Sequence, residues 1–124
     1  MEVNSLRILS TSFSPGRIHD FKLYKESKTR IPETVVIKGD LGYLGIQKIH
    51  ANSQIPKKNT KKHPLSKAAK AYNRQLSSER IFIEHVIGKL KIFKIISDRY
   101  RNRRKRFGLR FNLIAGIYNW ERDF

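Results

Sequence analysis

The chain has 124 residues, enough for one small domain, and it has no cysteine, which excludes disulfides, zinc–thiolate sites and cysteine nucleophiles. Its 27 lysines and arginines outnumber 10 acidic residues, for a net charge of +17, and the excess is concentrated in residues 51–124. This charge favours a polyanionic partner, above all a nucleic acid, because phosphate contacts release counterions. No apolar run approaches the roughly 18 residues that span a bilayer, so we expect no membrane partner.

The first forty residues predict short strands and one short helix. Leu6–Phe13 is rich in apolar and hydroxyl residues and ends at a Ser-Pro-Gly turn, which predicts a strand. Asp20–Ser27 predicts a helix, with Asp20 placed to cap its first amides. Thr34–Gly39 is mostly β-branched, which predicts a strand buried in a sheet.

The rest of the chain predicts a loop and two helices. Residues 52–64 are polar and lysine-rich, with two prolines, and predict an exposed basic loop. Ser66 is placed to cap a long helix that continues, with a break near Ser77, to about Ile96. After a basic run, Phe111–Trp120 predicts an apolar closing helix.

Asp40 is the first candidate for chemistry. It follows the predicted strand at once and begins a turn containing Gly42 and Gly45. Ligands gather beyond the carboxyl ends of strands in open parallel sheets, and a carboxylate there can hold a hard cation such as Mg²⁺. The alternative is that Asp40 only caps the hydrogen bonds of the turn. The pattern leaves both readings open.

Glu84 is the second candidate, on the predicted long helix. One face of this helix carries a stripe of apolar residues that we expect in the core: Phe82, Ile83, Val86, Ile87, Leu90 and Phe93. On another face Arg80 and Lys91 flank Glu84, and Gly88 leaves space one turn along. This arrangement can receive a phosphate through a metal ion. The alternative is a surface ion pair between Arg80 and Glu84, worth a few tenths of a kcal/mol.

The segment Arg99–Arg110 is the candidate nucleic-acid interface. Aromatic residues interleave with its basic ones, and arginine grips phosphate through two parallel hydrogen bonds. A solvated tail is the alternative, but the apolar helix that follows should anchor the segment. Its basic residues are Arg99, Arg101, Arg103, Arg104, Lys105, Arg106 and Arg110.

Together these passages resemble bacterial insertion-sequence transposases of the DDE superfamily, in the group related to the Harbinger transposases. The resemblance runs from about Leu6 to Trp120. Four passages carry it, of which the second and third are the specific ones: Thr11–Ser27 (TSFSPGRIHDFKLYKES), Lys38–His50 (KGDLGYLGIQKIH), Asn73–Ile95 (NRQLSSERIFIEHVIGKLKIFKI) and Arg99–Trp120 (RYRNRRKRFGLRFNLIAGIYNW).

The resemblance implies a ribonuclease-H-like α/β fold and roles for particular residues. Asp40 would be the second catalytic acid and Glu84 the third, both as ligands of Mg²⁺ or Mn²⁺. Arg80, Glu84 and Lys91 keep the spacing of a family signature whose leading tyrosine is replaced here by Ser77. The resemblance further implies cleavage of transposon ends, strand transfer into target DNA, and a bacterial, cytoplasmic, nucleoid-associated protein.

The family's first catalytic Asp has no match in this chain. That residue lies on the first strand of the fold, and neither Glu2 nor Asp20 corresponds to it by position. We therefore expect residues 1–124 to form the C-terminal part of the catalytic domain, lacking the first strand or strands and inactive alone. Such a part would pair with an N-terminal transposase half or self-associate. The rival hypothesis is a small basic nucleic-acid-binding protein of ribosomal or RNA-binding type, which has no need of Asp40 and Glu84.

Overall fold

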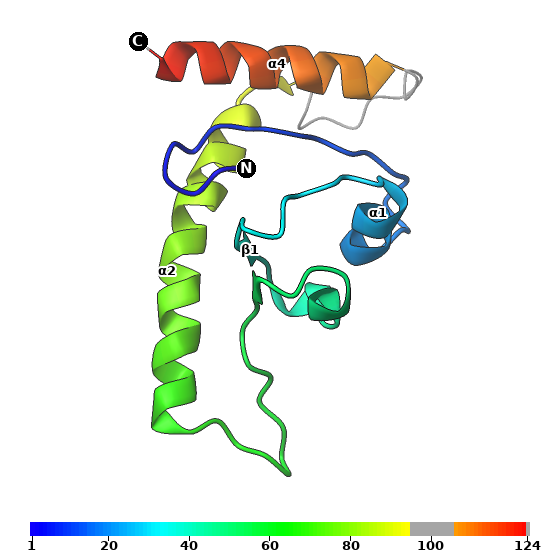
Figure 1. Ribbon diagram of the computed structural model, residues 1–124. Coiled ribbons are helices and arrows are strands. Elements are labelled where there is room, and N and C mark those ends of the chain that lie inside the picture. Colours follow the sequence, from blue (N-terminus) through cyan, green and yellow to red (C-terminus); the bar gives the residue numbers. More distant parts are fainter. Residues whose placement is uncertain (95–105, 124) are drawn as a thin grey trace. The chain divides into compact units, whose positions relative to one another are not determined.

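The computed structural model describes residues 1–94 and 106–123 (Figure 1). The chain divides into two compact units. The first unit joins Met1–Phe13 to Glu79–Phe124, and the second is Ser14–Ser78. The long helix α2, Lys67–Leu90, contributes to both. Helices and a small sheet make up the described chain, in agreement with the predicted α/β class. None of the described helices is long and apolar enough to cross a membrane.

The first unit is built on the end of α2 and on helix α4, Phe107–Arg122. The predicted closing helix is therefore confirmed, and it begins four residues earlier than Phe111. Its core joins Val86 and Leu90 of α2 to Ile114 and Tyr118 of α4, and all four are at least nine-tenths buried. Leu6, Ile8 and Phe111 pack against this cluster.

The predicted strand at Leu6–Phe13 is wrong, because this segment is paired with a helix instead of a sheet. The backbone amide of Ile8 donates to Oδ1 of Asn119 at 2.9 Å, and Nδ2 of Asn119 donates to the Ile8 carbonyl at 2.8 Å. Arg122 donates to the Ser5 carbonyl at 2.7 Å, and the Thr11 hydroxyl bonds Asn112. The segment thus runs antiparallel to α4, whose side chains satisfy its backbone.

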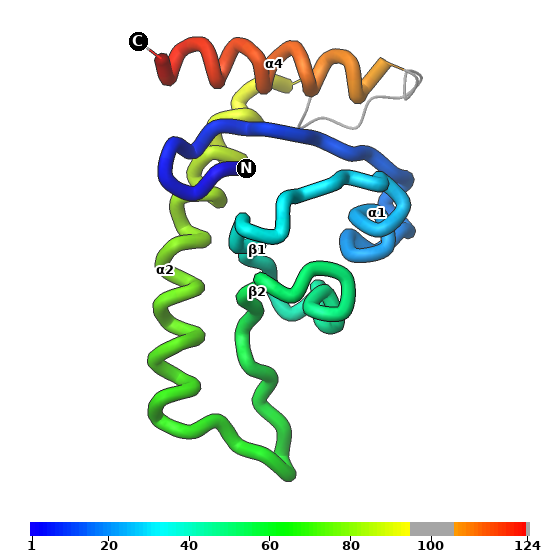
Figure 2. The backbone as a smooth tube through the Cα atoms, viewed as in Figure 1, coloured from blue at the N-terminus to red at the C-terminus, as the bar shows by residue number. Residues whose placement is uncertain are grey.

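The second unit contains helix α1, Asp20–Glu26, and two very short parallel strands, β1 at Ile37–Lys38 and β2 at Ser53–Gln54 (Figure 2). Two single-turn 3₁₀ helices, η1 at Leu41–Tyr43 and η2 at Ile46–Lys48, lie between the strands in sequence. Four apolar residues of this unit are buried: Ile46, Ile55, Ala69 and Leu76. His50 is buried with them and its Nε2 hydrogen-bonds the Val35 carbonyl at 2.7 Å.

Two predictions for the second unit need correction. The strand predicted at Thr34–Gly39 shrinks to β1, and it is not buried, since Val35 and Val36 are 47% and 42% exposed. The loop predicted at 52–64 is exposed from residue 57 onwards, but its first part forms β2 and leads into buried Ile55. The helix α1 agrees with prediction, although His19 caps it and Asp20 only begins its first turn.

Helix α2 begins where the sequence predicts, because Oγ of Ser66 accepts the amide of Ala69 at 3.1 Å. The predicted break near Ser77 is absent, and the helix is continuous to Leu90. The apolar stripe is narrower than expected. Val86 and Leu90 are buried and Ile83 is half-buried, whereas the predicted core residues Phe82, Ile87 and Phe93 are 58%, 42% and 47% exposed.

Candidate functional site

Asp40 lies two residues beyond the carboxyl end of β1, the strand that pairs in parallel with β2. It is the N-cap of η1, and its Oδ1 accepts the amide of Gly42 at 2.9 Å. The turn-capping reading is therefore realised in the structure. One carboxylate oxygen is oriented by this bond, and the residue as a whole is only half-buried. A capped, oriented carboxylate at a strand end can still accept a cation, so the two readings are compatible.

Aromatic side chains of α1 and η1 pack together near Asp40. The two elements contact each other, and Tyr43 packs against Phe21 and Tyr24 with ring centroids 5.8 and 6.4 Å apart. Burial, followed by the negative charges of Asp20 and Asp40, raises the pKa of Tyr43 above its ordinary value. Its phenol therefore stays neutral at neutral pH beside these carboxylates.

His19 is a neighbour of Asp40 that sequence reasoning missed. Its Nδ1 accepts the amide of Phe21 at 3.3 Å, and its ring and the Asp40 carboxylate both lie close to the position that a β-carbon at Gly42 would occupy. The His19–Asp20 pair is too common a dipeptide to predict this. Only the packing of α1 on η1 brings His19 beside Gly42, and no local pattern encodes that packing.

Glu84 projects from α2 as half of an i,i+4 ion pair. Nη2 of Arg80 lies 3.8 Å from Oε1 of Glu84, with the side chains 42% and 64% exposed. At Gly88, one turn along, an added β-carbon would meet nothing within 4 Å, as the predicted open space requires. Lys91 follows the last helical residue, and its amide still bonds the Ile87 carbonyl at 3.0 Å. The surface ion pair is thus real, and a further role for Glu84 stays a prediction.

The pairing of Asp40 with Glu84 also stays a prediction. Asp40 belongs to the second unit and Glu84 to the first. Both are hard oxygen donors, which suit Mg²⁺ or Mn²⁺. Within residues 1–94 and 106–123, no three acidic or histidine side chains come together in a way that would hold a metal ion. The donor chemistry therefore fits a divalent cation, but a complete ligand set needs at least one further group.

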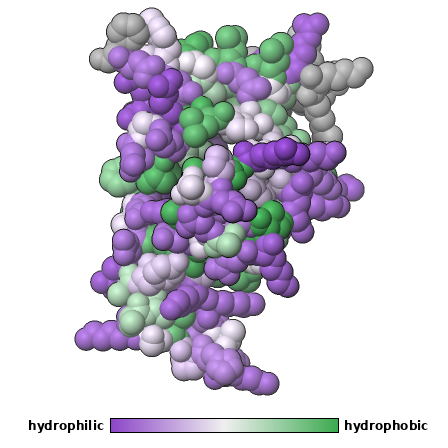
Figure 3. Space-filling model, in the orientation of Figure 1, coloured by the Kyte–Doolittle hydropathy of each residue, from purple (hydrophilic) through white to green (hydrophobic). Residues whose placement is uncertain are grey.

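The basic run is described only in its last part, since residues 99–105 lie outside the described residues. Arg106 is exposed at the start of α4 and Arg110 is half-buried on its first turn. The predicted anchor is present, because Phe107 and Phe111 pack edge-on against Phe13 with centroids 5.7 and 5.3 Å apart. Hydrophilic side chains cover much of the surface that Figure 3 shows.

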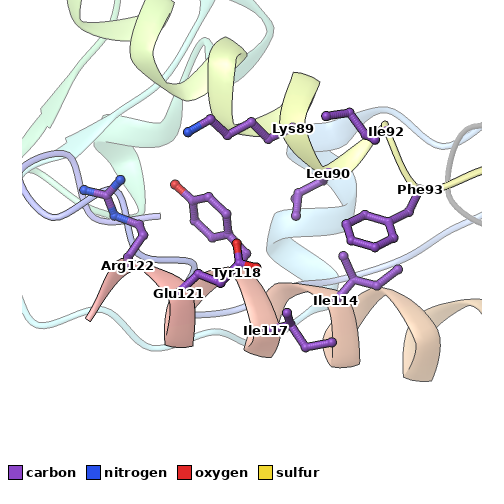
Figure 4. Close-up of a pocket in the computed structure, with 9 residues that line it drawn as sticks. All are labelled: Lys89, Leu90, Ile92, Phe93, Ile114, Ile117, Tyr118, Glu121 and Arg122. Atoms are coloured by element: carbon purple, nitrogen blue, oxygen red, sulfur yellow. The ribbon is translucent and has the colours of Figure 1, made fainter. Parts of the chain in front are cut away.

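A pocket of about 560 Å³ lies in the first unit, between the end of α2 and α4 (Figure 4). Its walls are mainly apolar, and Glu121 is the one acid among the described residues that line it. Neither Asp40 nor Glu84 lines it, so it is not a candidate for carboxylate chemistry. The lining residues are Lys89, Leu90, Ile92, Phe93, Ile114, Ile117, Tyr118, Glu121 and Arg122.

Comparison with known proteins establishes the family. Residues 4–119 match the model of the DDE superfamily endonucleases, and the chain belongs to this family. It is 51% identical over 115 residues to the probable transposase for insertion sequence element IS702 of Microchaete diplosiphon. The match covers 93% of this chain but 42% of that relative, so the chain spans less than half of the relative's length. No solved structure matches. Membership of this family argues against the alternative hypothesis of a small basic nucleic-acid-binding protein of ribosomal or RNA-binding type.

Proposed function

We propose that this chain is the C-terminal part of the catalytic domain of a DDE transposase, in the Harbinger-related group, with a ribonuclease-H-like fold in the complete enzyme. The complete enzyme cuts DNA at element ends and joins them to target DNA. The observation that carries the proposal is the place of Asp40, an oriented carboxylate just beyond the end of a parallel strand, in a chain of this family. Such strand ends are where ligands gather in open sheets.

Asp40 and Glu84 are proposed as the second and third metal-binding acids. The Gly42 amide holds one oxygen of Asp40 and thereby fixes the direction of the carboxylate. Arg80 lies beside Glu84, one helical turn before it, with Nη2 3.8 Å from Oε1. When bound, divalent ions would stabilise negative charge on the attacking and leaving oxygens of a phosphodiester.

Basic residues are proposed to hold the DNA. Lys91 and Arg80 border Glu84 and would bind phosphates on either side of the cut. The run 99–110 would bind the duplex backbone farther away, with little sequence preference, because phosphate contacts carry no direct sequence information. The aromatic cluster of Phe13, Phe107 and Phe111 fixes the end of this run on the first unit. DNA held there remains tied to the rigid helix α4.

The first catalytic acid is proposed to lie outside residues 1–124. Glu2 and Asp20 do not match it by position, and the described residues bring together no three metal ligands. We therefore expect the chain alone to be inactive and to act with an N-terminal transposase half. The two described strands leave an open sheet edge, which is also a surface for self-association.

The test is a chimera in which this chain replaces the matching 42% of the Microchaete relative. We expect the chimera to nick DNA that carries the relative's element ends, in Mg²⁺ or Mn²⁺, and the 124-residue chain alone to leave it intact. Asp40→Asn and Glu84→Gln should each abolish nicking, since both remove a charge at nearly constant shape.

Glu26→Gln is the matched control for Glu84→Gln. Glu26 also forms an exposed i,i+4 ion pair, with Lys22 at 3.8 Å, so its loss costs the fold about as much as the loss of Glu84. The control should nick DNA like the parent chimera. Full activity in the Asp40 and Glu84 variants would overturn the assignment, and nicking by the chain alone, lost in those variants, would show that the missing acid is misplaced.

A further inference from the structure

Two polar side chains, those of Asp40 and His19, lie close to the position that a side chain at Gly42 would occupy. A β-carbon added there would lie 3.0 Å from Oδ1 of Asp40, and 3.2 Å from Cε1 and 3.5 Å from Nε2 of His19. The first two distances are shorter than most real β-carbon contacts, so the missing side chain leaves room for the imidazole and the carboxylate to face the same small volume. All three residues belong to the second unit, which holds them on α1 and at η1.

The hydrogen bond to Phe21 fixes which ring nitrogen of His19 carries the proton. A backbone amide can only donate, so Nδ1 must accept with its lone pair. A neutral imidazole has one donor and one acceptor, and Nε2 is therefore the N–H. In this arrangement His19 is a hydrogen-bond donor next to Asp40.

The Nε2–H has no acceptor within the described residues, and His19 is exposed. Its ring nevertheless lies beside the carboxylate to which the proposed function assigns a metal ion. A phosphate oxygen of a strand bound at Asp40 would lie in the volume that both side chains face. Phosphate oxygens are acceptors only, and neutral side-chain donors are ordinary partners for them.

We propose that His19 is a DNA-contacting residue, whose Nε2–H donates a hydrogen bond to a phosphate oxygen of the strand bound at Asp40. This inference rests on the proposed function, because it takes Asp40 as the place where the strand is bound. The contact is between a neutral donor and the backbone. It should therefore add affinity and position the strand, but it should release no counterion.

Two substitutions separate this role from the helix-capping role of His19. In His19→Asn, the side-chain oxygen can accept the Phe21 amide as Nδ1 does, and asparagine is among the best N-caps, but the donor at Nε2 is lost. In His19→Gln, an N–H can reach the position of Nε2 while the cap is weakened. We expect His19→Asn in the chimera to bind element-end DNA about three- to tenfold more weakly, as loss of one hydrogen bond predicts. His19→Gln should recover most of that affinity.

The salt dependence and the tautomer give independent readouts. His19→Asn should leave the slope of log affinity against log salt unchanged, whereas loss of a phosphate-binding cation lowers that slope by about one. In the 124-residue chain with ¹⁵N-labelled histidine, the His19 signal, assigned through its loss in His19→Asn, should show Nε2 protonated and Nδ1 not.

Each contrary result has its own meaning. Parent-like affinity in His19→Asn, with His19→Gln the weaker variant, would show that His19 only caps α1. A protonated Nδ1 would also overturn the contact. If Asp40→Asn still nicks DNA, the proposed function falls and this inference with it. If Asp40→Asn is inactive while His19→Asn binds normally, the inference alone is wrong.

Discussion

Gly88→Ala should stabilise the chain and weaken its hold on DNA at the same time. Gly88 lies inside α2, two residues before its end, and an added β-carbon would meet nothing within 4 Å. Replacing glycine by alanine in a helix gains about 0.8–1 kcal/mol, and the nearness of the helix end reduces this to about 0.5–1 kcal/mol. For a domain of this size the gain corresponds to a rise in Tm of about 2–5 °C.

The effect on DNA follows from the position of Gly88 one turn after Glu84. If a DNA phosphate approaches the bare backbone there, the methyl group keeps it away. We expect the affinity of the chimera for element-end DNA to fall about fivefold, equivalent to about 1 kcal/mol. Calorimetry or thermal melting followed by circular dichroism gives the Tm, and fluorescence anisotropy with a labelled duplex gives the affinity.

Gly116→Ala is the matched control for this experiment. Gly116 lies within α4, and an added β-carbon there also has nothing within 4 Å. Its substitution should raise the Tm similarly and leave the affinity for DNA unchanged. A lower Tm for Gly88→Ala would refute the statement that the space beside Gly88 is open. A stabilised variant that binds DNA as the parent does would refute the close approach of a phosphate to this face.

Two further predictions concern the basic run and the N-terminal segment. Replacing Arg103, Arg104 and Arg106 together by glutamine should weaken DNA binding and lower the slope of log affinity against log salt by up to about 3. Fluorescence anisotropy over a series of salt concentrations measures both effects. An unchanged slope would mean that the basic run is a solvated surface that does not contact DNA. Asn119→Ala should destabilise the chain by about 2 kcal/mol in urea melts, because it removes two hydrogen bonds to Ile8 in a part-buried place. Asn73 forms an equivalent pair of hydrogen bonds, with the backbone of Lys57, at an exposed site. Asn73→Ala should therefore destabilise the chain by less than half as much as Asn119→Ala, and equal losses of stability would contradict the reasoning.

The helices could be predicted from the sequence because their signals are local. Ser66 and the apolar spacing after it fix the start and the course of α2. The break expected near Ser77 is absent, and the neighbouring hydroxyl of Ser78 donates to the Gln75 carbonyl within the helix, at 2.7 Å. Serine there is accommodated by the helix and does not interrupt it.

The strand at Leu6–Phe13 was predicted wrongly because its partner lies more than a hundred residues away. The apolar and hydroxyl pattern is typical of a strand, and the segment is extended enough to bury Leu6 and Ile8 in part. Its backbone bonds, however, go to Asn119 and Arg122 of α4. The local sequence pattern does not show whether the backbone of such a segment will hydrogen-bond to a neighbouring strand or to side chains of a helix.

In the candidate site, too, the features with local signals could be predicted and those that depend on long-range packing could not. The position of Asp40 at a strand end could be predicted, because a β-branched run followed by a glycine turn specifies it locally. Tyr43 is a local neighbour, since it lies in the turn that Asp40 caps, but His19 could not be predicted, because only the packing of α1 against η1 brings it there. The helical spacing places Arg80 and Lys91 on either side of Glu84 along one face of the helix. The Arg80–Glu84 ion pair confirms the position of Arg80.

The central claim is that Asp40 and Glu84 hold the same metal site. A crystal structure of the chimera grown with Mn²⁺ measures this directly, because anomalous scattering locates the ion. We predict carboxylates within roughly 8 Å of each other, with manganese bound between them, since paired catalytic ions lie about 3.5–4 Å apart. Carboxylates on opposite faces of the protein, with manganese bound elsewhere, would contradict the claim.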